Sequence, residues 1–147
     1  MQYLGSKEIL NNHKTGFLCS RKIPADIILK TYDWAIEQRG NGKCIISGFH
    51  SVIEKDVFHF LLKGTQPIIM VLARGMKKRW DDNLIKEIDK GRLLIISNFN
   101  EKVTRPTIET TMERNKLILE LADEMYIPFV LPGGNLEKAI HEFQNKF

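Results

Sequence analysis

Five short apolar runs rich in β-branched residues divide this chain, and each is followed by a segment with helical spacing of its apolar residues. The runs cover residues 16–19, 43–46, 68–72, 93–96 and 125–131. Apolar strands that alternate with helices are typical of a parallel sheet covered by helices on both faces. We therefore predict an α/β fold of the Rossmann-like kind, with three layers and about five parallel strands.

Proline and glycine mark where the intervening helices begin and end. Pro24 suits the start of a helix, and Gly40, Gly64 and Gly91 suit helix ends. Asn135 is a candidate cap for the final helix. The pattern predicts helices over residues 24–40, 53–64, 84–91, 112–122 and 135–147.

Pro128, inside the last apolar run, constrains the order of the strands. Proline has no N–H to donate to a central ladder, so this strand is expected at an edge of the sheet. Counted along the chain, the order 3-2-1-4-5 satisfies this, with a switch point between the first and fourth strands. We expect one domain over residues 1–147, preceded within it by a polar leader, residues 1–14.

Composition excludes several classes of protein. No apolar run approaches the roughly 18 residues of a membrane span, and residues 1–14 lack the apolar centre of a secretory signal, so we expect a cytoplasmic protein. Cys19 and Cys44 lie in or at the ends of predicted strands, where buried free thiols are expected. The four histidines show no metal-ligand spacing, so we expect neither a metal nor a cofactor.

Four strand ends carry small or anion-seeking residues. In open parallel sheets, ligands bind at the carboxyl ends of the strands. The first loop offers a hydroxyl, a guanidinium and an ammonium group before a helix, which favours an anion, although a plain surface turn explains it too. The four loops are Cys19-Ser20-Arg21-Lys22, Ser47-Gly48-Phe49-His50, Ala73-Arg74-Gly75 and Pro132-Gly133-Gly134-Asn135.

Each of the other candidate residues has a structural alternative. Gly48, Gly133 and Gly134 let a backbone approach a phosphate, or simply serve turns. Arg114 and Asn115 reach beyond the fourth strand, unless Asn115 caps its own helix. Glu54 and Asp56 suit acid–base chemistry, but two acids in a first helical turn are more often partners of the helix dipole. The basic residues 74–79 and Trp80 suit single-stranded nucleic acid, or form a solvated loop.

Five motifs in sequence order resemble the DNA-processing protein A (DprA/Smf) family. They span residues 16–143, and the family belongs to a larger Rossmann-like group that includes the Lonely Guy (LOG), lysine-decarboxylase-like proteins. Ser47-Gly48 is similar to the family's S-G turn, and Gly133-Gly134-Asn135-Leu136 falls where the family has S-G-S-L. The remaining three are Cys19-Ser20-Arg21-Lys22 for G-S-R-x, residues 71–76 for V-L-G-x-G-L, and residues 114–123 for R-N-R-I-I-x-x-L-S-D.

The resemblance implies a crevice that binds a nucleotide or single-stranded DNA, in a protein of DNA processing or uptake. It also implies a homodimer and a recombinase partner. The family's A-R-G-I-D becomes His50-Ser51-Val52-Ile53-Glu54 here, which indicates a diverged member. From the residues and the resemblance together, the expected ligand-binding residues are Ser20, Arg21, Lys22, Ser47, Gly48, Phe49, Arg74, Arg114, Asn115, Gly133, Gly134 and Asn135.

Two other functions stay open at this point. A LOG-like nucleoside-monophosphate phosphoribohydrolase would use P-G-G-x-G-T-x-x-E, of which the chain keeps Pro132-Gly133-Gly134 and offers Glu137 as the one candidate acid. A non-catalytic oligomeric scaffold is the third possibility. We expect binding rather than catalysis and assign no catalytic residue, because no Ser-His-Asp set or carboxylate pair has suitable spacing.

Overall fold

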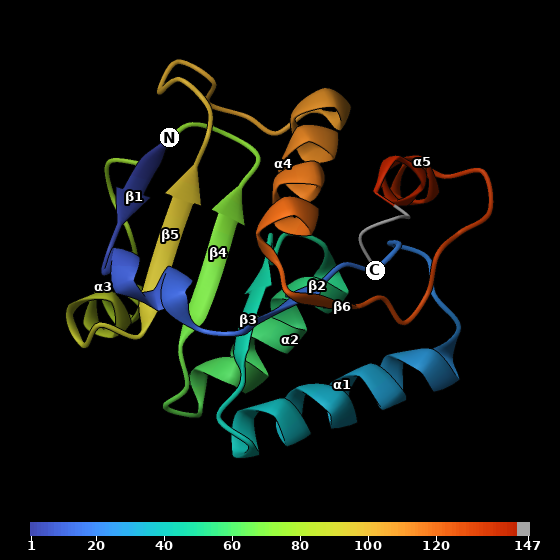
Figure 1. Ribbon diagram of the computed structural model, residues 1–147, viewed down its shortest axis with the longest axis horizontal. Coiled ribbons are helices and arrows are strands. Elements are labelled where there is room, and N and C mark those ends of the chain that lie inside the picture. Colours follow the sequence, from blue (N-terminus) through green and yellow to red (C-terminus); the bar gives the residue numbers. More distant parts are fainter. Residues whose placement is uncertain (144–147) are drawn as a thin grey trace.

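The computed structural model describes residues 1–143, in which six strands form a single sheet between two groups of helices (Figure 1). The strands are β1 (Gln2–Leu4), β2 (Lys14–Phe17), β3 (Cys44–Ser47), β4 (Ile68–Leu72), β5 (Leu93–Ser97) and β6 (Glu124–Tyr126). The helices are the 3-10 turn η1 (Lys7–Asn11), α1 (Ala25–Gly40), α2 (Val52–Leu62), α3 (Asp82–Asp89), α4 (Ile108–Leu121) and α5 (Asn135–Glu142). The predicted α/β class and largely parallel sheet are confirmed.

The strand order is β1-β5-β4-β3-β2-β6, so the predicted order is wrong. The run at residues 93–96 becomes β5 and pairs with β4, not with β2. The short helix α3 connects these neighbouring strands, and α4 then carries the chain back across the sheet to β6 beside β2. After β5 the chain therefore crosses back over the sheet instead of adding the next neighbouring strand. Strand β6 still lies at an edge, as predicted, although the strand order differs.

The fifth apolar run is a strand only over Glu124–Tyr126, and Pro128 lies beyond it. The chain nevertheless continues along β2 and its loop, because Leu18 N–H donates to Tyr126 O at 3.3 Å and Ser20 N–H to Phe129 O at 3.1 Å. Proline thus ends regular pairing here rather than marking an edge position within a strand.

The predicted polar leader is part of the fold. Strand β1 pairs antiparallel with β5, with Gln2 opposite Ser97, and it covers the edge that β5 would otherwise expose. Ile9 of η1 is buried in the core. A strand of three residues gives no periodic signal, which is why the sequence pattern did not predict it.

Helix boundaries follow the predictions except at α4 and α5. Helix α4 begins at Ile108 instead of residue 112, because Thr107 Oγ1 accepts from Thr110 N–H at 3.1 Å while Thr110 Oγ1 accepts from Thr107 N–H at 2.8 Å. Gly134, rather than Asn135, is the N-cap of α5. The predicted end of that helix, residues 144–147, lies outside the described residues.

Two cores sandwich the sheet. Helices α1, α2 and α3 cover one face, where Phe17, Ile45 and Ile95 point, and α4 and α5 cover the other, with Ile46 and Ile96. At the β6 edge the rings of Trp34 and Tyr126 stack at 4.1 Å between centroids. Both cysteines are buried and free, as predicted. The arrangement leaves the loops after the parallel strands at one end of the sheet.

Candidate functional site

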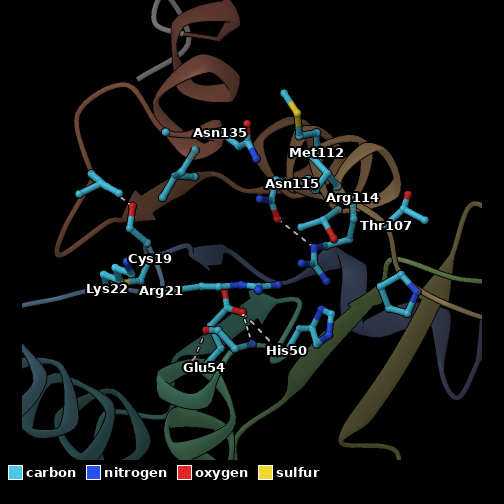
Figure 2. Close-up of a pocket in the computed structure, with 18 residues that line it drawn as sticks. Cys19, Arg21, Lys22, His50, Glu54, Thr107, Met112, Arg114, Asn115 and Asn135 are labelled. Carbon is cyan, nitrogen blue, oxygen red and sulfur yellow. Dashed lines mark hydrogen bonds between the residues drawn. The ribbon is translucent and has the colours of Figure 1, made fainter.

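A cavity of about 680 Å³ lies at the carboxyl ends of β2 and β3, between α4 and α5 (Figure 2). Its lining comes from the loop after β2, the start of α2, the first two turns of α4 and the segment that leads into α5. These residues are Cys19, Ser20, Arg21, Lys22, His50, Ser51, Glu54, Pro106, Thr107, Ile108, Thr111, Met112, Arg114, Asn115, Leu131, Gly134, Asn135 and Leu136.

Four helices begin at or next to this cavity. Its lining includes Ser51, Thr107 and Gly134, the N-cap residues of α2, α4 and α5, and Lys22, shortly before α1. Helix N-termini carry a partial positive charge and unpaired N–H groups, so each of them favours an anion. The helix dipoles therefore favour an anion in the cavity, although capping boxes already pair backbone N–H groups at the starts of α2 and α4.

Arg114 forms the cationic centre of the cavity. Its side chain is 3% exposed, its Nε donates to Asn115 Oδ1 at 2.9 Å, and its Nη1 donates to Val71 O at 3.3 Å. Burial lowers the pKa of this guanidinium, Glu54 raises it and Arg21 lowers it further. The bond to Asn115 fixes the orientation of both side chains toward the ligand space (Figure 2).

Arg21 reaches across the cavity from the loop after β2 toward the guanidinium of Arg114 (Figure 2). The nearby carboxylate of Glu54 offsets part of the repulsion between these two guanidinium groups, and an anion between them would offset more of it. Guanidinium forks also match phosphate oxygens in geometry. Arg21 and Arg114 thus bring two guanidinium groups, which suit phosphate, to the same cavity.

Ser20 connects the first loop to the segment before α5. Its Oγ accepts from Leu131 N–H at 2.8 Å, and this acceptor role leaves the hydroxyl hydrogen for a ligand. Lys22 and Asn135 also line the cavity and are exposed. The structure therefore brings together Ser20, Arg21, Lys22, Arg114, Asn115, Gly134 and Asn135 from the predicted set.

Glu54 is a helix cap, as the dipole interpretation predicted. Its Oε1 accepts from Ser51 N–H at 2.9 Å and from His50 N–H at 3.1 Å, while Ser51 Oγ accepts from Glu54 N–H. This capping box fixes the start of α2. With both backbone bonds made to one oxygen, the carboxylate is held as a structural partner beneath the two arginines (Figure 2).

Five residues of the predicted set lie outside the cavity lining. Ser47 is fully buried and its Oγ accepts from Phe49 N–H at 3.4 Å. Phe49 is buried too and packs on Phe58 with 4.7 Å between ring centroids. Arg74 donates from Nε to Gly75 O, and Gly133 N–H donates to Glu137 Oε1 at 3.3 Å. The fifth residue is Gly48.

Gly48 contacts Arg114 rather than the ligand space. A Cβ atom at this position would overlap the guanidinium of Arg114. The absence of a side chain therefore lets Arg114 lie over the turn between β3 and α2. The predicted close approach does occur, but the approaching group is a protein side chain.

Sequence reasoning missed one wall of the cavity. This wall is the start of α4, which presents Ile108, which is 68% exposed, and Met112. Leu131, which is 42% exposed, lies beside the first loop, where its N–H donates to Ser20 Oγ. Apolar side chains exposed beside two arginines match a ligand with a phosphate and a flat base. The missing signal was the early start of α4, which places Ile108 and Thr111 on the helix that faces the cavity.

His50, also missed, lies in the cavity near Arg114 (Figure 2). Partial burial lowers the pKa of its imidazole, and the nearby charges of Arg114, Arg21 and Lys55 lower it further, against the opposing effect of Glu54. Cys19 is also in the lining, but burial raises the pKa of its thiol to about 11, so the thiol is protonated at neutral pH.

Within residues 1–143 no group of three His, Cys, Asp or Glu side chains is placed to hold a metal ion. Over the same range, no helix is both long and apolar enough to cross a membrane. Glu137, the candidate acid for glycosidic cleavage, lies outside the cavity lining and accepts the N–H of Gly133.

The comparisons with known proteins bear on the family and the fold. The model of the family described as DNA recombination-mediator protein A matches residues 1–128. Among solved structures, the chain is similar to DNA processing protein A of Helicobacter pylori, described for its single-stranded DNA binding mode, with 21% identity and a TM-score of 0.75. It is also similar to DNA processing protein A of Streptococcus pneumoniae, with 19% identity and a TM-score of 0.71.

These two matches cover 97% and 95% of this chain. The chain spans 67% of the Helicobacter pylori protein and only 51% of the Streptococcus pneumoniae protein. No curated protein matches the sequence. At these identities the structural likeness establishes the fold.

Proposed function

This chain belongs to the DNA recombination-mediator protein A (DprA) family, and from that premise we propose that its cavity binds single-stranded DNA. The observation that carries the proposal is the convergence of Arg21 and Arg114 in a cavity surrounded by helix N-termini. One phosphate of the strand would lie between the two guanidinium groups. The relative from Helicobacter pylori is described as binding single-stranded DNA, which supports this choice of ligand.

The shape of the cavity supports a strand rather than a free phosphate. Asn115 is oriented by Arg114, and its amide nitrogen is available to a base or sugar. Ile108 and Met112, at the start of α4, provide an apolar surface for a base. A ligand that presents both a phosphate and a base therefore uses both walls.

The test is a binding isotherm of labelled oligo-dT at two salt concentrations, with AMP and other mononucleotides as competitors. Counterion release predicts that affinity for a strand with several phosphate contacts falls steeply as salt rises. Arg21→Ala is expected to weaken binding by about 1–3 kcal/mol, or roughly 5- to 150-fold, because a charge-assisted contact is lost. Arg114→Lys keeps the charge, loses the planar fork and is expected to weaken binding similarly.

Lys43→Ala is the matched control, because Lys43 is exposed at the opposite end of the sheet, just before β3. Unchanged affinity in folded Arg21→Ala and Arg114→Lys proteins would overturn the proposed site. Saturable binding of mononucleotides without any binding of oligonucleotides would replace DNA by a nucleotide as the ligand.

The family's description as a recombination mediator also supports a role in passing the bound strand to a recombinase. We include that partner, and self-association, in the proposal. The check is whether the protein speeds recombinase assembly on oligo-dT, and whether its mass in solution is that of one copy or two. Arg21→Ala is expected to reduce any such acceleration in proportion to its loss of DNA affinity.

A further inference from the structure

Two loops beside the cavity concentrate the positive charge of the chain. The loop between β4 and α3 (residues 73–81) and the loop between β5 and α4 (residues 98–107) together contain six Lys or Arg side chains and two acidic ones. Their net charge of +4 equals that of the whole chain, so all other residues together are neutral. We refer to the six cations as the basic ridge: Arg74, Lys77, Lys78, Arg79, Lys102 and Arg105.

The two loops are held against each other. Gly75 N–H donates to Val103 O at 2.8 Å, and Ser97 Oγ donates to Arg74 O at 2.6 Å. Gly75 packs so closely on the backbone of Asn100 that a Cβ atom there would overlap it. Both loops lie at the end of the sheet where α4 begins (Figure 1). The basic ridge is therefore a defined surface rather than two independent loops.

The charges of the basic ridge have no acidic partners in the part of the chain described. None of the ion pairs found among residues 1–143 includes any of the six side chains. Five of the six are exposed, and Arg74 is half-buried. Unpaired like charges raise the energy of the folded state, and a polyanion that binds to them relieves this repulsion.

The basic ridge is continuous with the cavity along the chain. Arg105 directly precedes Pro106, Thr107 and Ile108, which line the cavity. Trp80 is half-buried, and the ammonium group of Lys77 lies 5.1 Å from the centroid of its ring. Since Lys77 lies over this ring, Trp80 is a poor platform for a base, and the surface recognises charge.

Resting on the proposed function, we propose that the basic ridge is a second contact surface for the same DNA strand, which follows it over the start of α4 after leaving the cavity. The contacts are between ammonium or guanidinium groups and backbone phosphates, and they are independent of base sequence. A short oligonucleotide occupies the cavity alone, whereas a longer one also reaches the basic ridge. Affinity and salt dependence are therefore expected to increase with strand length.

The experiment compares oligo-dT of about four nucleotides with oligo-dT of about twenty, a range that spans typical single-strand site sizes. The variant is Lys77→Gln/Lys78→Gln/Arg79→Gln in the full chain. For the long strand, losing three phosphate contacts is expected to reduce the slope of log affinity against log salt by about 2, which is roughly 100-fold in affinity at 0.1 M salt. For the short strand, the affinity is expected to stay unchanged.

The matched control is Lys7→Gln/Lys43→Gln/Lys63→Gln, which removes the same charge at the other end of the sheet. Equal losses in both triple variants would show a non-specific effect of net charge and would overturn the proposal. Identical slopes for long and short strands in the native protein would also overturn it. If the short strand binds and Arg21→Ala weakens that binding, the proposed cavity site stands whatever the result for the basic ridge. If the short strand does not bind, the cavity proposal itself is wrong.

Discussion

At the scale of single residues, Gly48 shows how the site depends on a missing side chain. Its Cα lies under the guanidinium of Arg114, which also bonds to Val71 and Asn115. Arg114 is 66 positions away in sequence, so no local pattern could have predicted this contact. The predicted site contained both residues but not the relation between them.

Gly48→Ala is expected to displace Arg114 and weaken binding of oligo-dT about tenfold or more, because the added methyl group overlaps the guanidinium. Gly40→Ala is the matched control, since its Cβ would meet no atom within 4 Å. That control is expected to keep full affinity and to unfold at the same temperature or slightly higher. Native affinity in a folded Gly48→Ala protein would show that Arg114 tolerates the methyl group.

His50 is expected to make DNA binding depend on pH. Partial burial, followed by the nearby charge of Arg114 and smaller effects of Arg21 and Lys55, lowers the pKa of the imidazole in the unbound protein, and Glu54 opposes this. A phosphate bound near these cations raises that pKa, so binding takes up a proton and affinity increases as pH falls through the region below about 6.5. His50→Gln is expected to flatten this part of the profile, measured with oligo-dT at constant ionic strength.

The lowered pKa of His50 has the opposite effect on folding stability, which is expected to decrease as pH falls. The folded protein binds the His50 proton less tightly than the unfolded chain does, so this residue contributes stability above pH 6.5 that decreases as pH falls. A His50→Gln protein is therefore expected to lose less stability as pH falls below 6.5. If DNA affinity and the free energy of unfolding depended on pH in the same way in both proteins, His50 would not be the group responsible.

At the scale of elements, strand–helix alternation was predictable because β-branched runs and glycine stops are local signals. Strand order was not, since it depends on which connection crosses the sheet, and no local pattern marks that crossing. The start of α4 was not predicted because its capping box is formed by Thr107 and Thr110. The usual capping-box pattern has Glu or Gln at the second of these positions.

The site was predictable to the same extent. Arg21, Lys22 and Asn135 directly follow strands or precede helices, so the rule for parallel sheets placed them correctly at one edge. Ser47 ends β3 and Phe49 follows it, but both side chains turn into the protein, where they are buried. The direction of a side chain in a short turn depends on packing against distant elements, such as Phe58 of α2.

Arg92 connects three elements at the opposite end of the sheet. It is 7% exposed, and it donates to Gln66 O at 2.9 Å, to Leu61 O at 2.9 Å and to Glu87 Oε1 at 3.0 Å. Arg92→Ala is expected to destabilise the protein by about 3–5 kcal/mol, because it leaves the carbonyl groups of Gln66 and Leu61 buried without this donor and removes one of the two cations paired with Glu87. Urea unfolding measures this free energy.

Arg39→Ala is the comparison variant, because among residues 1–143 the Arg39 side chain donates one hydrogen bond, to Phe60 O at 3.0 Å. Its expected cost is about 1 kcal/mol. Equal costs for the two variants would mean that the additional bonds of Arg92 contribute nothing measurable. Oligo-dT affinity, measured well below the unfolding transition, is expected to be native in both.

At the scale of the whole molecule, the first fourteen residues belong to the fold rather than leading into it. Strand β1 closes one edge of the sheet, and Ile9 joins the core that α4 and α5 cover. The opposite edge, β6, lies beside the cavity-lining segment that leads into α5. The molecule thus protects the sheet edge far from its site with its own N-terminal residues.

Ile9→Ala is expected to lower the free energy of unfolding by about 2–4 kcal/mol, as for other large-to-small changes in a core. Leu29→Ala is its control: Leu29 is 66% exposed on α1, and its removal is expected to change stability by no more than about 0.5 kcal/mol. If Ile9→Ala were equally mild, the N-terminal segment would be an appendage, as the sequence pattern alone had indicated.

The ammonium group above Trp80 also has an optical consequence. The chain has two tryptophans, and Trp34 is stacked on Tyr126 at the far edge of the sheet. In a Trp34→Phe protein the remaining emission comes from an indole whose ring lies 5.1 Å from the Lys77 charge. A phosphate that draws this ammonium away changes the electric field across the ring and shifts the emission colour. Trp80 is therefore an intrinsic fluorescence probe for DNA bound at the basic ridge.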